Sequence, residues 1–118
     1  MRNYALYLKD ILDAMEAIEK FVGAIDFDGF QSSDMITSAV IRKFEIIGEA
    51  AKNIPEDIRS KYPQIPWKEM AGMRDRLIHF YSGVKYELVW HTIKDIIPNV
   101  KSLLQKIIEE IESKTQSK

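Results

Sequence analysis

Apolar residues recur every three or four positions along most of this chain, which is the spacing of one face of an α-helix. The first stripe predicts a helix that ends near residues 26–29, and its members are Tyr4, Leu8, Ile11, Leu12, Met15, Ile18, Phe21, Val22 and Ile25. A second helix is predicted to begin after residues 32–34, whose side-chain oxygens can cap its first turn. It ends at Pro55. Its stripe comprises Met35, Ile36, Ala39, Val40, Phe44, Ile47, Gly48 and Ala51.

Three further helices are predicted in the second half of the chain. A short one covers residues 55–62, and a long one starts at Pro66 and runs towards residues 80–81. The last helix begins at about Tyr86 and contains Pro98, which must kink or break it. Its apolar stripe consists of Val89, Ile93, Ile96, Val100, Leu103, Ile107 and Ile111.

Together these elements predict an all-α fold. No strand-like alternation, repeat or low-complexity tract competes with the helical spacing. We therefore expect an antiparallel helical bundle with four to five main helices. A length of 118 residues fits one domain, which we place at residues 1–112, followed by a frayed tail at residues 113–118.

Composition narrows the chemistry that the chain can perform. The sequence contains no cysteine, which excludes a thiol nucleophile and a disulfide framework and fits a reducing compartment. Its two histidines, His79 and His91, form no zinc-binding motif, so we expect neither a metal nor another cofactor. The N-terminus does not resemble a signal peptide, and no apolar run approaches the roughly 20 residues that span a bilayer. We therefore expect a cytoplasmic protein with no membrane contact.

The net charge of −1 hides an uneven distribution. Residues 1–58 carry six Lys or Arg against eleven Asp or Glu, whereas residues 59–86 carry six basic residues against only two acidic ones. A basic segment within a mildly acidic protein is suited to an anionic ligand, although it can also be no more than a solvated loop.

A charged residue interrupts the apolar stripe of the third long helix. On a helical wheel with Trp67 at zero, Arg74 falls at about −20°, in the middle of a stripe that spans about 60° on either side. This stripe contains Trp67, Met70, Ala71, Leu77, Ile78 and Tyr81. An unpaired buried guanidinium is costly, so Arg74 needs a carboxylate, a bound anion or a wet cleft. The structural interpretation pairs it with Glu45 or Glu49 of the second helix.

Two further residues near Arg74 can take part in chemistry. His79 lies about 140° around the helix from Arg74, so the two converge only if the helix loosens or a second copy of the chain contributes. Asp75 lies about 40° from His79 and can orient its ring. Tyr81 returns to the face of Arg74. The structural alternatives are a histidine that favours a helix C-terminus and a half-buried core tyrosine. His91 has no such neighbours, and we interpret it as structural.

The spacing Arg74-x4-His79-x-Tyr81 resembles the signature of the HEPN superfamily, in its branch of HepT-like ribonuclease toxins. The resemblance also covers residues 42–52, the Ile-Pro-Trp run at 65–67, residues 72–79, Val-Trp at 89–90 and Ile-Ile-Pro at 96–98. It extends over roughly residues 4–112. Asp75 stands where asparagine is frequent in the family, and that difference can alter the orientation of His79.

This resemblance implies an activity and an assembly. The expected protein is a helical homodimer in which Arg74 and His79 of both protomers line a cleft, with Asp75 and Tyr81 in support. It implies a metal-independent endoribonuclease whose RNA substrate, tRNA or mRNA, is cleaved by attack of the ribose 2′-OH on the adjacent phosphorus. It also implies a partner, a minimal nucleotidyltransferase antitoxin that transfers AMP to Tyr81.

Two other interpretations come from different functional classes. The chain can be a non-catalytic helical dimer that binds a nucleotidyltransferase or a nucleotide, with Arg74 as an anion contact. It can also be a purely structural bundle in which Arg74 forms an internal ion pair. Ribonuclease assays separate the first interpretation from an enzyme, and the stability of an Arg74 variant separates the second.

Overall fold

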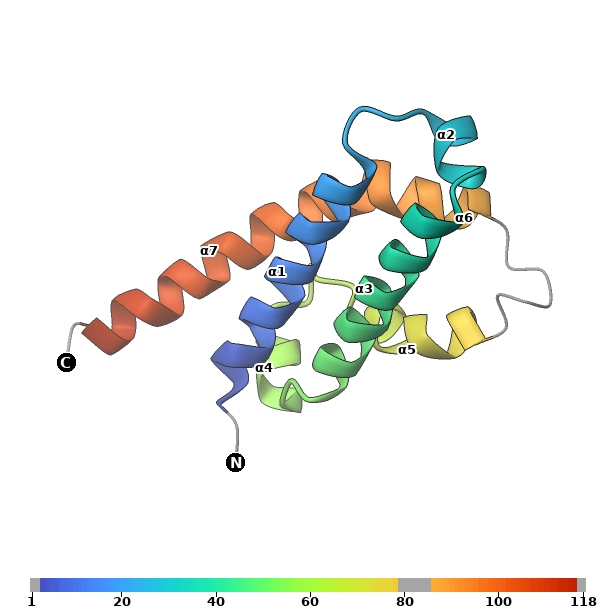
Figure 1. Ribbon diagram of the computed structural model, residues 1–118. Coiled ribbons are helices and arrows are strands. Elements are labelled where there is room, and N and C mark those ends of the chain that lie inside the picture. The colour runs from blue at the N-terminus through green and yellow to red at the C-terminus, as the bar shows by residue number, and fades with distance from the viewer. Residues whose placement is uncertain (1–2, 79–85, 117–118) are drawn as a thin grey trace.

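The computed structural model describes residues 3–78 and 86–116, and every described element is helical. Seven α-helices are labelled in Figure 1 along these residues, and a short π-helical segment precedes the last of them. The helices are α1 (Tyr4–Val22), α2 (Phe27–Gln31), α3 (Asp34–Lys52), α4 (Glu56–Lys61), α5 (Trp67–Ile78), α6 (Tyr86–His91) and α7 (Ile97–Gln116), and the π segment is Thr92–Ile96. The predicted all-α bundle is confirmed.

Side-chain caps set the first helix boundaries. The Asn3 side chain accepts a hydrogen bond from the Ala5 N–H at 3.0 Å and begins α1. Gly23 ends this helix with a φ of 49°, a left-handed conformation that favours glycine. The prediction of one helix up to residues 26–29 is therefore wrong. Asp26 instead accepts from the Gly29 N–H at 2.9 Å and caps the separate short helix α2.

The second long helix begins where the sequence predicts. The Ser33 hydroxyl accepts a hydrogen bond from the Ile36 N–H at 3.1 Å, which satisfies one of the unpaired donors of the first turn of α3. Helix α3 ends at Lys52, just before Pro55. The predicted short helix at 55–62 is confirmed as α4, which is flanked by Pro55 and Tyr62.

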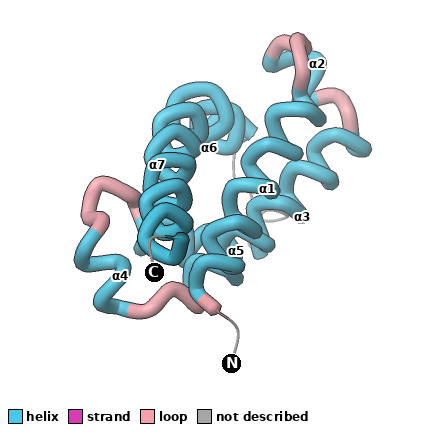
Figure 2. The backbone as a smooth tube through the Cα atoms, turned by 90° about the vertical axis from the view of Figure 1, so that its left-hand side faces the viewer, coloured by secondary structure: helices cyan, strands magenta, loops and turns pink. Residues whose placement is uncertain are grey.

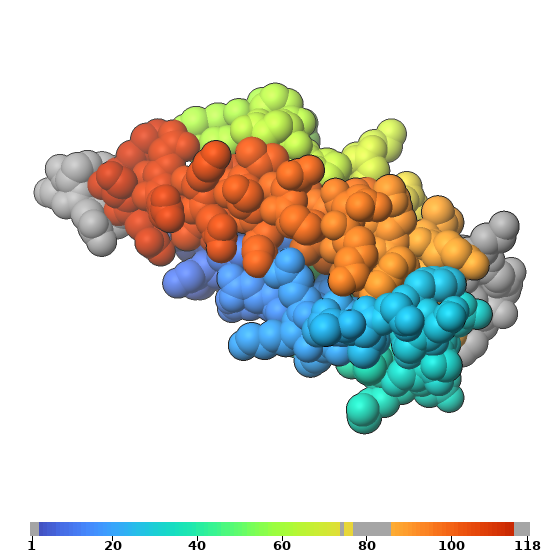
Figure 3. All heavy atoms as spheres, turned by 90° about the horizontal axis from the view of Figure 1, so that it is seen from above, coloured from blue at the N-terminus to red at the C-terminus, as the bar shows by residue number. Residues whose placement is uncertain are grey.

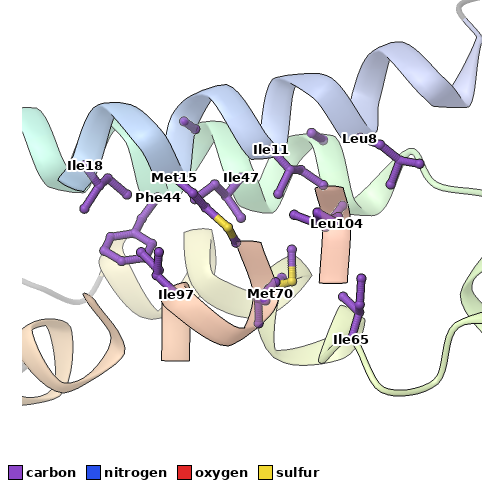
Figure 4. Packing of buried hydrophobic residues seen from close by; sticks show 14 of the residues in the cluster. Leu8, Ile11, Met15, Ile18, Phe44, Ile47, Ile65, Met70, Ile97 and Leu104 are labelled. Carbon is purple, nitrogen blue, oxygen red and sulfur yellow. The ribbon is translucent and has the colours of Figure 1, made fainter. Parts of the chain in front are cut away.

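The long helices enclose one core. Helices α1 and α3 run antiparallel side by side, α5 packs on α3, and α7 packs on α1 (Figures 1 and 2). Buried side chains from all four meet between them, as Figure 4 shows. The labelled members are Leu8, Ile11, Met15, Ile18, Phe44, Ile47, Ile65, Met70, Ile97 and Leu104.

The last predicted helix is divided by the π segment. The Ile97 N–H donates to the carbonyl of Thr92, five residues back, instead of four residues back as in an α-helix. Pro98 follows directly and has no N–H to donate, so the predicted interruption lies at the expected place. The wider turn also shifts the buried face. Ile97 is 1% exposed whereas Ile96 is 39% exposed, which corrects the predicted stripe at Ile96.

The C-terminal helix is longer than expected. Helix α7 continues to Gln116, past the predicted domain boundary at residue 112, and its far half extends along one end of the molecule (Figure 1). The molecule accordingly measures 51 × 27 × 23 Å. The division into a domain at 1–112 and a frayed tail remains a prediction.

Candidate active site

Helix α5 carries the first two residues of the predicted site, and its N-terminal turn is firmly held. The Trp67 indole N–H donates to the Tyr62 carbonyl at 2.9 Å, and the Met70 N–H donates to the Pro66 carbonyl at 3.0 Å. Trp67 and Met70 are each 6% exposed, which confirms this part of the predicted apolar stripe. Pro66 thus lies one position before the first helical residue. The core therefore determines where the later turns of α5 lie.

Arg74 and Asp75 lie in the later turns of this helix. The Asp75 side chain is exposed, as is that of Arg76. The Arg74 side chain falls outside the described ones. Of the two acids considered for it, Glu45 accepts a hydrogen bond from Arg42 at 3.3 Å on the surface of α3.

His79 and Tyr81 lie in residues 79–85, outside the described residues. The positions on either side of this stretch are described, since α5 reaches Ile78 and α6 starts at Tyr86 (Figure 1).

The beginning of α6 is held by a cluster of aromatic rings, which we call the aromatic cluster. It consists of Phe27 and Phe30 of α2 and Tyr86 and Trp90 of α6. Ring centroids of Phe30 lie 6.2 Å from Tyr86 and 5.2 Å from Trp90, and Phe27 lies 6.1 Å from Trp90. Such contacts add to the stability that area burial provides. Sequence reasoning did not identify this cluster, although the i,i+3 and i,i+4 spacings of its members indicate two aromatic faces.

One groove among the described residues is poorly suited to a polyanionic ligand such as RNA. A groove of about 380 Å³ runs between α1 and α3, and it is lined by Tyr7, Asp10, Arg42, Glu45, Ile46, Glu49, Ala50 and Asn53. Three carboxylates against one guanidinium make this groove acidic, which disfavours the binding of phosphate groups. The surface of α4 and α5 is mixed in charge, because both basic and acidic side chains are exposed there: Lys61, Lys68 and Arg76, and Glu56, Asp57, Glu69 and Asp75.

Among the described residues we looked for a second histidine site and for a metal site. The Nδ1 atom of His91 lies 2.6 Å from the Asp95 carboxylate, and both side chains are exposed. No group of three His, Asp or Glu side chains in the described part of the chain is arranged to hold a metal ion. None of its helices is long and apolar enough to cross a membrane.

Comparison with known proteins identifies the family. The family model described as "Ribonuclease HepT-like" matches residues 11–107, a range that includes Arg74, His79 and Tyr81. The chain belongs to the HepT-like ribonuclease family. The sequence-based assignment to this family is confirmed, and so is the coarser prediction of a ribonuclease.

Individual relatives of the HepT-like family agree over nearly their whole length. "Probable ribonuclease HepT" of Thermococcus cleftensis is 48% identical over 106 residues, which cover 90% of this chain and 96% of the relative. A protein of Methanocaldococcus jannaschii named as a "Putative RNase" is 50% identical over 113 residues, which cover 96% and 97%. A second one from that organism is 48% identical over 116 residues, which cover 98% and 96%. No solved structure matches the chain significantly.

Proposed function

We propose that this HepT-like protein is the metal-independent endoribonuclease of a toxin–antitoxin pair, with Arg74 and His79 as its catalytic residues. The observation that supports this most is the family match, because it spans the core helices and includes the whole Arg74-x4-His79-x-Tyr81 spacing. The segment 59–86, with six Lys or Arg against two Asp or Glu, further supports an RNA substrate.

The proposed reaction is an internal transfer followed by loss of the downstream strand. The ribose 2′-oxygen attacks the adjacent phosphorus and loses its proton to a base, while the bond to the 5′-oxygen breaks and that oxygen gains a proton. The products are a 2′,3′-cyclic phosphate and a free 5′-hydroxyl. His79 suits both proton transfers, because an unperturbed imidazole titrates near pH 6.5.

Arg74 has a different proposed role. Its planar guanidinium donates two parallel N–H bonds to a phosphate and stabilises the charge that grows on the equatorial oxygens. The proposed role of Asp75 is to orient the ring of His79, four residues further along the chain. A second protomer supplies a second His79, so that one imidazole accepts a proton and the other donates one.

Cleavage in the presence of EDTA tests this proposal. Purified native protein is incubated with mixed tRNA and mRNA, alongside His79→Ala purified identically. We expect cleavage by the native protein alone, with products that end in a 2′,3′-cyclic phosphate. Equal cleavage by both proteins would reveal a contaminant or a misassigned site, and products with a 3′-hydroxyl and a 5′-phosphate would refute the mechanism. Absence of cleavage by either folded protein would favour the non-catalytic binding module.

We further propose that a minimal nucleotidyltransferase antitoxin inactivates the enzyme by transferring AMP to Tyr81. Each transfer brings a negative phosphodiester and a bulky adenosine into the region that receives RNA, so repulsion and occlusion act together. Co-expression with this partner should raise the intact mass by roughly 329 Da or its multiples, the mass of an AMP residue. Tyr81→Phe should abolish the increase, and a modification that persists in this variant would overturn the assignment.

A further inference from the structure

The indole of Trp90 contacts two aromatic rings and an exposed cation. The ring centroid of Phe30, which is 0% exposed, lies 5.2 Å away at an interplanar angle of 36°, and that of Phe27 lies 6.1 Å away. The Lys94 ammonium lies over the same indole at 4.9 Å from its centroid. Trp90 itself is half-buried, and Lys94 is exposed. The core therefore leaves the indole partly accessible, and the flexible side chain of Lys94 lies over it.

Among the described residues, the acidic neighbours of Lys94 contact other groups. The carboxylate of Asp95, the next residue, lies 2.6 Å from the Nδ1 atom of His91. Glu19, which lines a hollow of about 210 Å³ together with Lys94, pairs with Lys101 at 2.5 Å. Among the described residues no carboxylate forms an ion pair with Lys94. Its ammonium is thus available to an incoming anion.

The location suits contact with a substrate. Trp90 lies on α6, the helix that follows residues 79–85, and α6 meets α2 at one end of the molecule (Figures 1 and 3). Trp90 thus lies four residues after Tyr86, on the helix that directly follows the stretch containing the proposed catalytic His79 in the sequence.

We propose that Trp90 and Lys94 form a stacking site for one base of single-stranded RNA. This inference rests on the proposed ribonuclease function. The base stacks on the outer face of the indole, and Lys94 moves aside to contact the neighbouring phosphate. An exposed cation–π contact is worth roughly a factor of two to five in an equilibrium constant, whereas base–aromatic stacking is worth roughly 5- to 150-fold. The exchange therefore favours the base, and the freed ammonium gains an anionic partner.

Binding of a non-cleavable strand tests the site. The probe is a single-stranded 2′-O-methyl oligonucleotide of mixed sequence and about twelve nucleotides, which has no free 2′-OH to attack the phosphorus. We expect Trp90→Leu to weaken binding roughly 5- to 150-fold, and Trp90→Phe, which keeps a flat ring, to restore most of the affinity. In the native protein the probe should also quench tryptophan fluorescence, because Trp67 is buried and Trp90 faces the bound base.

The lysine provides a test that does not disturb packing. Lys94→Ala should lower the slope of log Kd against log salt by about 0.7, the value for one phosphate contact on a single strand. Lys106→Ala, which removes an exposed lysine from α7, is the matched control and should leave the slope unchanged. If Trp90→Leu does not fold, as circular dichroism will show, the Lys94 slope alone decides. Native affinity in folded Trp90→Leu, or a native slope in Lys94→Ala, would overturn the proposal.

Cleavage of natural RNA in EDTA is measured on the same preparations, so that the two proposals fail separately. Cleavage by the native protein together with undiminished binding by Trp90→Leu would refute the stacking site and leave the ribonuclease standing. Trp90-dependent binding of the probe without any cleavage would establish the stacking site and refute the ribonuclease.

Discussion

Tyr62 joins three helices of the bundle through its two oxygens. Its carbonyl accepts the indole N–H of Trp67 at the start of α5, and its hydroxyl donates to the Glu110 carboxylate of α7 at 3.3 Å. The ring is 8% exposed. The residue at the end of α4 thus ties the helix that carries Arg74 to the last helix of the bundle.

We expect Tyr62→Phe to lower the stability slightly and to change its pH dependence. Losing the hydroxyl should cost about 0.5 kcal/mol, the lower end for a hydrogen bond, because Glu110 remains accessible to water. Burial, followed by the nearby Glu110 carboxylate, raises the pKa of Tyr62 above its ordinary value of 10.0. Its contribution to stability is therefore complete below pH 10 and is lost as pH rises through the raised pKa.

Thermal unfolding of the two proteins between about pH 8 and pH 12 measures this difference. The native protein should be the more stable below pH 10, and its advantage should shrink above that pH. The other tyrosines are common to both proteins, so their titration cancels in the comparison. An advantage that stays constant across the whole range would show that the hydroxyl titrates as in the unfolded chain.

Substitution of Arg74 tests whether this residue is catalytic or forms a structural ion pair. A structural ion pair with Glu45 or Glu49, neither of which is buried, is worth only about 0–1 kcal/mol, so Arg74→Ala should then leave RNA cleavage intact. Under the proposed function the loss of stability should also stay below about 1 kcal/mol, but RNA cleavage is abolished. RNA cleavage by folded Arg74→Ala, beside Lys106→Ala as a control that removes an exposed lysine, decides between them.

At the scale of the elements, the sequence predicts helix boundaries from local signals more reliably than it predicts contacts between helices. The Ser33 cap and the short helix α4 follow from side chains near in sequence, and both are confirmed. The aromatic cluster was missed because α2 and α6 are far apart in sequence and only the folded chain brings them together. For the candidate site, the residues stay a prediction from the sequence, and the described structure adds the anchoring of α5 and α6 on either side of them.

The π segment shows why a regular helical period failed at Ile96. Val89, Ile93 and Ile97 are all buried at a spacing of four, which would drift around an ideal α-helix. The wider π turn brings Ile97 back to the core face and turns Ile96 outward. A single Pro98 indicates an interruption, but it does not determine whether the helix kinks, breaks or widens.

A pair of isoleucine substitutions tests this face. We expect Ile97→Ala to cost about 2–5 kcal/mol, because it removes buried methyl groups and leaves a cavity between α7 and the core. Ile96→Ala deletes the same atoms from a side chain that is 39% exposed, so its cost should be below about 1 kcal/mol. Urea unfolding gives both values. Equal costs would mean that the segment adopts an ordinary α-helix in solution.

At the scale of the whole molecule, a single chain supplies one Arg74 and one His79, whereas the proposed reaction uses two imidazoles. A two-fold symmetric dimer would bring the second set to the same cleft. The elongated shape of 51 × 27 × 23 Å leaves long helix faces on the surface. We therefore expect light scattering to give a particle of twice the 13.7 kDa chain mass.

Mixed dimers test whether the two copies share one reaction. Native protein and His79→Ala are unfolded together in urea at equal concentrations and refolded, so that protomers pair at random. If both His79 side chains are required, only native homodimers cleave RNA, and activity per native chain falls to about one half of its unmixed value. If each protomer acts independently, activity per native chain is unchanged.

A matched mixture with Lys106→Ala controls for losses on refolding, since that protein should dimerise and cleave normally. Unchanged activity per native chain, in a mixture shown by mass spectrometry to contain mixed dimers, would rule out shared acid–base chemistry and assign both proton transfers to one protomer.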